Sequence, residues 1–235
     1  MLTRREAVVG GLLACTCRAQ AAKLTSGCIL ADHEVERFFT ERRAFSVDND
    51  PIVTRSGDRE FDFALAQTLS PLSDTFQVLP GFAYFNDSDS PNAYASPVVR
   101  MARTDGTVFF GQRFLKKLLA LPEQPDVAVT AVCAHEFGHI LQFKLNLSLT
   151  DKRLELHADY LAGYYAGVLK LKRPDYPAAV FATQQFLAGG LNHGTSDERA
   201  AAVVRGFEVA YRERRNLPNA VQIGINYVSR TDTRQ

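Results

Sequence analysis

The chain has 235 residues, of which 46% are hydrophobic and 23% are charged, a composition typical of one globular domain or at most two small ones. This balance excludes collagen-like, low-complexity and wholly disordered chains. The 27 Lys and Arg residues are nearly matched by 26 Asp and Glu residues, so the formal net charge is only +1. Because there is no charge excess, we expect no nucleic-acid partner and no attraction to an anionic membrane surface.

The first residues have the pattern of an export signal. Arg4-Arg5 precedes an apolar run over residues 7–14, and Ala19-Gln20-Ala21 offers a cleavage site of the small-x-small type. The arginine pair favours the twin-arginine route. We therefore expect residues 1–21 to be a cleaved signal and the mature protein to be periplasmic or secreted.

A second cleavage pattern overlaps the first. Leu12-Leu13-Ala14-Cys15 fits a bacterial lipobox, and cleavage there would leave a lipid anchor on Cys15 of a membrane-anchored lipoprotein. The longer signal is preferred because a signal that ends before Cys15 would be unusually short. No later stretch reaches the roughly 18 apolar residues needed to cross a bilayer, so we expect no transmembrane segment in the mature chain.

The mature chain, residues 22–235, is expected to form a single domain, since neither internal repeats nor a Gly/Ser-rich linker divides it. It retains two cysteines, Cys28 and Cys133, which allow either one disulfide or two free thiols. The sequence does not decide whether residues 22–75 cover a cleft or complete the core.

The first half of the mature chain combines helices with a small sheet. Hydrophobic spacing predicts helices over residues 30–43 and 59–69. Between residues 76 and 112, short apolar runs alternate with turn residues, which is typical of strands, and residues 107–110 are the clearest strand. The sheet is therefore expected upstream of the remaining helices.

The second half is predicted to be helical. A helix is expected over residues 112–121, and Asp126 and Asp151 stand at the N-cap positions of the next two helices. Thr195 and Glu198 form a capping box before a further helix. Together these elements predict an α+β fold that is mostly helical.

The sequence His135-Glu136-Phe137-Gly138-His139 is an H-E-x-x-H motif within a predicted helix. Residues four apart lie on one face of a helix, so His135 and His139 can bind a single Zn²⁺ ion. Glu136 is offset by one residue and can face a water molecule on that ion. A pair of structural core histidines is the competing interpretation.

A third zinc ligand is required, because catalytic zinc sites have three protein ligands and one open position. At about 100° per residue, Glu155 and Asp159 share a helix face with small side chains, whereas His157 points away from it. Small side chains allow close approach to another helix. We therefore predict Glu155 as the third ligand, with Asp159 orienting a ligating histidine through its second ring nitrogen. The alternative is a solvated acidic helix face.

These motifs carry a family resemblance over about residues 90–206. The H-E-x-x-H motif followed by Glu155-x-x-x-Asp159 resembles the gluzincin metallopeptidases. Asn92-Ala93-Tyr94-Ala95, a strand over 107–110 and a helix leading into H-E-F-G-H look like the order in CAAX-processing and stress-induced membrane zinc proteases. The string E-L-H-A-D-Y-L-A-G and the later H-G-T-S-x-x-R are similar to bacterial neutral zinc metallopeptidases.

The resemblance implies a zincin-like fold, in which an edge strand of the small sheet packs on the active-site helix and a second helix carries a ligand. It also implies one Zn²⁺ ion and an extended polypeptide substrate added to an edge strand. That strand is expected at residues 92–96, with Asn92, Ala93 and Tyr94 as candidates, or at residues 107–110. His193 is a candidate donor to the developing oxyanion, by analogy with related enzymes. An ordinary surface loop and a structural histidine are the alternatives at these positions.

The function expected from these features is an exported zinc-dependent endopeptidase that uses a zinc-activated water, with Glu136 as general base. The first alternative is a non-catalytic, zinc-stabilised module that binds peptides in a chaperone-like manner. Hydrolysis of a non-peptide amide in the cell wall is a second alternative, because it would use the same metal chemistry.

Overall fold

The computed structural model describes residues 28–30, 32, 35–36, 52–53, 55–57, 59–88, 91–100, 102–178 and 193–231. The expected export signal over residues 1–21, with the alternative anchor at Cys15, lies outside the described residues. Of the helix expected over residues 30–43, residues 30, 32, 35 and 36 are described. The last three are helical, whereas Leu30 is not helical and instead bonds the backbone of Ala95.

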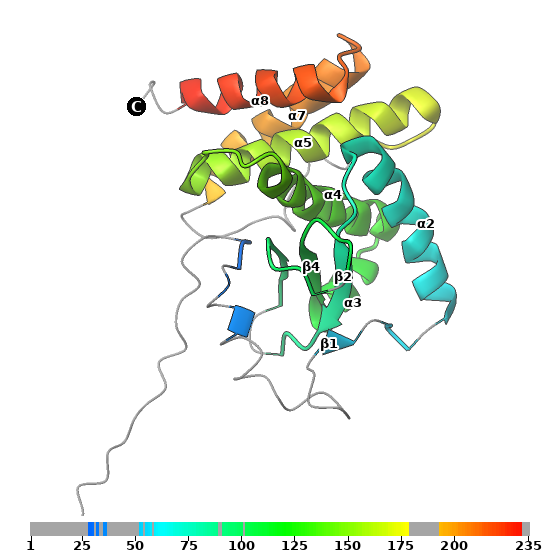
Figure 1. The fold of residues 1–235 in the computed structure, drawn as a ribbon. Coiled ribbons are helices and arrows are strands. Elements are labelled where there is room, and N and C mark those ends of the chain that lie inside the picture. Colours follow the sequence, from blue (N-terminus) through cyan, green and yellow to red (C-terminus); the bar gives the residue numbers. More distant parts are fainter. Residues whose placement is uncertain are drawn as a thin grey trace, which may run out of the picture.

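A four-stranded sheet forms one side of the molecule (Figure 1). Its spatial order is β1 (Ile52–Val53), β2 (Gly81–Phe85), β4 (Thr107–Gly111) and β3 (Ala93–Ser96). β2 and β4 pair in parallel, whereas β1 and β3 pair with them in the antiparallel direction. The predicted strand over residues 107–110 is confirmed. It lies inside the sheet, so of the two candidate substrate strands only β3 forms an edge of the sheet.

Both faces of the sheet are buried, and successive side chains alternate between two separate core clusters. Tyr84 and Phe110 face the large cluster that the sheet shares with the helices. Phe85, Tyr94 and Phe109 face a smaller cluster on the opposite side. The strands contain continuous apolar runs because neither face is left to solvent.

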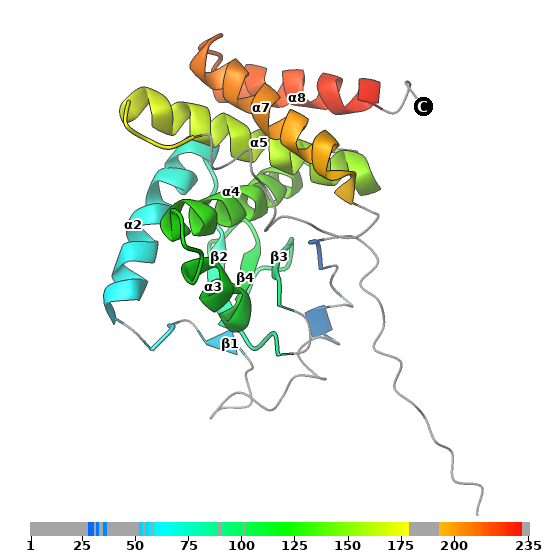
Figure 2. The ribbon, with the colours of Figure 1, turned by 180° about the vertical axis from the view of Figure 1, so that it is seen from behind.

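Six described helices accompany the sheet: α2 (Arg59–Phe76), α3 (Gln112–Leu119), α4 (Pro125–Lys144), α5 (Asp151–Lys172), α7 (Ser196–Tyr211) and α8 (Leu217–Thr231). α4 lies between the sheet and α5, and α7 and α8 lie beyond α5 (Figures 1 and 2). Residues 127–142 of α4 are all buried, which explains why this helix has no polar stripe.

The predicted helix over residues 59–69 continues through Pro71 to Phe76. Leu72 and Phe76 are completely buried in the large core cluster, and their packing stabilises the continuation. Local sequence pattern underestimates such a helix because burial of its last turn depends on partners distant in the chain. The helix expected over residues 112–121 ends at Leu119.

Two of the three predicted N-caps were placed too late, by two residues for α4 and by one residue for α5. Gln124, in a left-handed conformation with φ of 50°, is the N-cap of α4, and Asp126 lies within the first turn. Thr150 is the N-cap of α5, and Asp151 is its first helical residue. The capping box of α7 is confirmed, because the Thr195 side chain and the Glu198 side chain each bond the other residue's backbone N–H.

The coarse class predicted from the sequence, an α+β fold that is mostly helical, is confirmed. Cys28 and Cys133 are free thiols and do not form the disulfide that was one of the two alternatives. In the described part of the chain, no helix combines the length and apolarity required to cross a membrane.

Candidate metal centre

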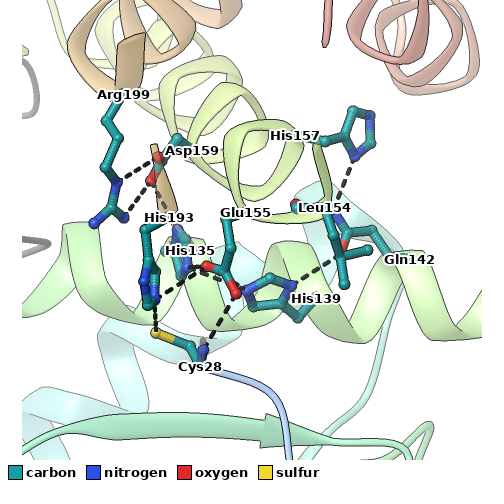
Figure 3. A network of polar contacts seen from close by, with 10 residues as sticks. All are labelled: Cys28, His135, His139, Gln142, Leu154, Glu155, His157, Asp159, His193 and Arg199. Carbon is teal, nitrogen blue, oxygen red and sulfur yellow. Dashed lines mark hydrogen bonds and ion pairs between the residues drawn. The ribbon is translucent and has the colours of Figure 1, made fainter. Parts of the chain in front are cut away.

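Three side chains from two neighbouring helices converge on one point. His135 and His139 lie on the same face of α4, and their Nε2 atoms are 3.1 Å apart. The Oε2 atom of Glu155 on α5 lies 3.2 Å from His135 Nε2 and 3.5 Å from His139 Nε2. The structure therefore brings together the three predicted metal ligands, all of them buried (Figure 3).

The two ligand-bearing helices approach closely where both have small residues. A Cβ atom on Gly138, inside the H-E-x-x-H motif, would lie 3.3 Å from the Ala158 Cα atom on α5. Gly163, further along α5, faces the Val203 backbone on α7. The small residues of α5 therefore bring two helices close to it, α4 on one side and α7 on another.

Asp159 orients the first histidine, as predicted. Its Oδ1 atom lies 2.9 Å from His135 Nδ1, so the His135 ring donates this N–H and directs its other nitrogen toward Glu155. Arg199 on α7 holds the same carboxylate through two hydrogen bonds of 2.7 and 2.9 Å. This buried bidentate pair compensates the charge that Asp159 carries beside the site.

The second histidine is oriented by residues that were not identified from the sequence. Gln142 Oε1 lies 2.8 Å from His139 Nδ1, and the Gln142 amide donates to the Leu154 carbonyl oxygen at 2.9 Å. The Gln142 amide also contacts His157 Nδ1 at 3.1 Å. The only sequence signal for this role is the spacing of Gln142, which lies one helical turn beyond His139.

When both rings are neutral, these contacts leave lone pairs, not N–H groups, at the centre of the site. With both Nδ1 atoms used as donors, the Nε2 atoms of His135 and His139 are acceptors that face each other and a carboxylate oxygen. Glu155 Oε2 is buried and has no hydrogen-bond partner among the described residues. Three acceptors that converge without a proton between them require a positive charge.

The pKa shifts of the site residues also indicate that the site favours a cation. Burial opposes ionisation of Glu155, but the imidazoles of His139 and His135 hold its pKa well below the usual range. Burial also opposes protonation of His135, yet the Asp159 carboxylate raises its pKa well above the ordinary value. The pocket therefore stabilises positive charge, which a proton or a metal cation can supply.

The donor set fits a metal ion. In a tetrahedral site with metal–nitrogen and metal–oxygen bonds of about 2.0–2.2 Å, ligand atoms lie roughly 3.3–3.5 Å apart. The three separations of 3.1, 3.2 and 3.5 Å between His135, His139 and Glu155 lie within about 0.2 Å of this range. These residues could hold a cation without rearrangement of the helices.

Glu136 lies beside the same point. One of its oxygens belongs to a group of potential ligand atoms, with His135 and Cys28, that all lie within 4.8 Å of one another. Burial raises the pKa of the Glu136 carboxyl to about 7, although the imidazoles of His135 and His139 oppose this rise. A carboxyl group with a pKa near neutrality is suited to accept and return a proton.

His193 and Cys28 lie beside Glu155 at the same site. His193 Nε2 lies 3.3 Å from Cys28 Sγ and 3.6 Å from Glu155 Oε2 (Figure 3). Burial and the carboxylates of Glu155 and Glu136 raise the pKa of the Cys28 thiol to about 12. Without a cation beside it, this thiol is therefore neutral and is not a nucleophile.

The predicted substrate strand lies at an edge of the sheet. Ala93 and Tyr94 belong to β3, and Asn92 directly precedes it. The outer side of β3 pairs with residues 28–30, because Ala95 exchanges two backbone hydrogen bonds with Cys28 and Leu30. Leu30 also packs beneath the sheet with Val35, so this part of residues 22–75 completes a core and borders the site.

Comparison with protein-family models, with curated proteins and with solved structures found no match to this chain. The chemistry of the site is therefore inferred from its own geometry.

Proposed function

We propose that this protein is an exported, zinc-dependent endopeptidase of the gluzincin type with a zincin-like fold. The observation that carries the proposal is the convergence of His135 Nε2, His139 Nε2 and Glu155 Oε2 within 3.1–3.5 Å of one another, with Glu136 beside them. Two imidazoles and a carboxylate form a ligand set that zinc uses in catalytic sites. The proposal of export, to the periplasm or the medium, rests on the pattern of residues 1–21.

Each residue of the site has a role in peptide hydrolysis. A bound zinc ion would supply Lewis acidity, which lowers the pKa of a water molecule and polarises a peptide carbonyl. Glu136 takes the proton of the attacking water and passes it to the departing amine. His193 faces the same point and donates a hydrogen bond to the oxygen on which negative charge develops.

The sheet supports a polypeptide as the substrate. β3 lies at a sheet edge and contacts α4, the helix that carries the two histidines. An extended peptide could pair with the outer backbone N–H and C=O groups of β3 as a further strand, in place of residues 28–30 that pair with Ala95. Backbone pairing of this kind requires no particular side-chain sequence in the substrate.

The proposed mechanism is tested by Glu136→Gln, which preserves the shape of the side chain and removes its ability to accept a proton. We expect the variant to bind one zinc ion and to lose about 100- to 10,000-fold of its cleavage of an unfolded protein substrate. Glu123→Gln is the matched control, because Glu123 is exposed in the turn before α4. Equal cleavage by the Glu136 variant and the wild type would refute the role of Glu136.

One observation favours a second function. Structural zinc sites have four protein ligands, and the Cys28 thiol lies near enough to the other groups to supply a fourth. A closed site of this kind would belong to a zinc-stabilised module that binds peptides without cleaving them. This module would be supported if the protein binds zinc but neither the wild type nor a Cys28 variant cleaves the substrate.

A further inference from the structure

The N-terminal segment 28–30, here called the strap, occupies the outer side of β3. The Ala95 N–H donates to the Cys28 carbonyl oxygen at 2.9 Å, and the Leu30 N–H donates to the Ala95 carbonyl oxygen at 3.0 Å. The strap runs parallel to β3, with Ile29 opposite Ala95. It therefore uses the backbone groups that an added peptide strand would need.

Buried contacts hold the strap in this position. The Ser96 hydroxyl donates to the Leu30 carbonyl oxygen at 2.8 Å, and both residues are completely buried. The Leu30 side chain packs with Val35 in the small cluster beneath the sheet. These contacts fix the position of Cys28 and Ile29, which precede Leu30, beside α4 and α5.

That place is the metal centre (Figure 3). The Cys28 N–H donates to Glu155 Oε1 at 3.2 Å, which leaves Glu155 Oε2 directed at the two histidines. The Cys28 sulfur lies 3.3 Å from His193 Nε2 and within 4.8 Å of potential ligand atoms of His135 and Glu136. The thiol thus lies close to both groups assigned to general-base and oxyanion roles.

We propose that the Cys28 thiolate is the fourth ligand of the zinc ion and that the strap keeps the peptidase in a latent form. The inference rests on the proposed zinc peptidase and concerns the regulation of its site. A thiolate is a strong ligand for zinc, and its proton is released to solvent when the sulfur–metal bond forms. The bound sulfur occupies the position that water must take, and the strap occupies the edge that the peptide must take.

The first test is the ligand environment of zinc in the full-length, zinc-loaded protein. X-ray absorption should show one sulfur at about 2.3 Å from the metal in the wild type. Cys28→Ala should lose this sulfur and still bind one zinc ion, because His135, His139 and Glu155 remain. Cys133→Ala is the matched control, since Cys133 is the other free thiol of the described chain and lies in the apolar core.

The second test is cleavage of an unfolded protein substrate by the same proteins. If the open form is a minor state populated at about 0.1–10%, removal of the thiol should raise cleavage about 10- to 1000-fold. Cys133→Ala should cleave at the wild-type rate. Cys28→Ser is a second variant that preserves the side-chain volume, in case the alanine variant does not fold, and it should also be activated.

The outcomes separate this inference from the proposed function. Zinc bound by the wild type without a sulfur ligand, with normal loss of cleavage in Glu136→Gln, would overturn the role of Cys28 and leave the peptidase intact. A sulfur ligand whose removal abolishes zinc binding and yields no cleavage would overturn latency in favour of a structural site. Failure of the wild type to bind zinc would overturn both.

Discussion

Each histidine of the candidate metal centre is oriented by a different group. Asp159 holds His135 through a carboxylate, and Gln142 holds His139 through a neutral amide. The carboxylate carries a charge in a buried place and is compensated by Arg199, whereas the amide needs no compensation. The two ring orientations therefore differ in their dependence on electrostatics, and the Asp159 contact is the more sensitive to loss of charge.

Replacement of Asp159 by Asn tests this contact at the residue scale. The variant retains an acceptor for His135 but loses the charge that raises the basicity of the ring, so zinc affinity should fall about 10- to 100-fold. Competition with a chelator measures the affinity. Glu198→Gln is the control, because Gln can also complete the capping box of α7. An unchanged affinity in the Asp159 variant would contradict the assigned role.

At the scale of the elements, α5 is the central helix. It contacts α4 with the face that carries Glu155, and it packs closely on α7 where Gly163 of α5 and Gly206 of α7 lie. A Cβ atom on Gly163 would overlap the Val203 carbonyl oxygen, and a Cβ atom on Gly206 would overlap the Tyr160 carbonyl oxygen. The two helices can approach at this distance only because both positions lack a side chain.

Gly163→Ala tests the packing of α5 on α7. The added methyl group must displace backbone, so we expect a loss of about 1–3 kcal/mol in the free energy of unfolding, measured by urea denaturation. Val204→Ala on α7 is the control, because Val204 is 46% exposed, and it should change stability by less than about 0.5 kcal/mol. A Gly163 variant as stable as this control would show that the helices are more loosely packed than described.

At the scale of the whole molecule, His157 links three helices. It extends from α5, accepts a contact from Gln142 of α4, and directs its Nε2 atom at the Val221 carbonyl oxygen of α8, 3.4 Å away. The residue is completely buried. Burial lowers the pKa of His157 to about 4 from an ordinary value of 6.5, so the folded protein holds this ring in the neutral state.

The neutral ring makes stability depend on pH. Below pH 6.5 the His157 ring binds a proton in the unfolded chain but stays neutral in the folded protein, which favours unfolding. The contribution of His157 to the free energy of unfolding is therefore fully present above pH 6.5 and is lost as the pH falls toward 4. The difference of about 2.5 in pKa corresponds to about 3 kcal/mol. Urea denaturation at about pH 7.5 and about pH 4.5 should show that the wild type loses about 2.5 kcal/mol more than His157→Gln, because pH 4.5 lies above the folded-state pKa and the full difference is not yet lost.

Comparison of the two proteins at each pH cancels the contribution of the other titrating groups, including the metal ligands. An equal loss of stability in the wild type and in His157→Gln would show that the ring is protonated within the fold. Such a result would also remove the assigned contact between His157 and the Val221 carbonyl oxygen.

Sequence alone determined the features that repeat along one element. The spacing of His135 and His139, the shared helix face of Glu155 and Asp159, and the capping box at Thr195 follow from 3.6 residues per turn. The strand over residues 107–110 and the mostly helical second half were predicted on the same basis. Helix boundaries were less accurate, because the last turns are stabilised by packing that local pattern does not report.

Only the tertiary structure decided which separate elements meet at the site. Gln142 and His157 orient His139 across two helices, and the backbone of Cys28 contacts Glu155, which is 127 positions away along the chain. Periodicity reports the neighbours of a residue within its own helix or strand. It does not report which distant segments come into contact. The entropic cost of closing a loop grows only slowly with its length, so segments far apart in the chain can meet without any signal in the local sequence.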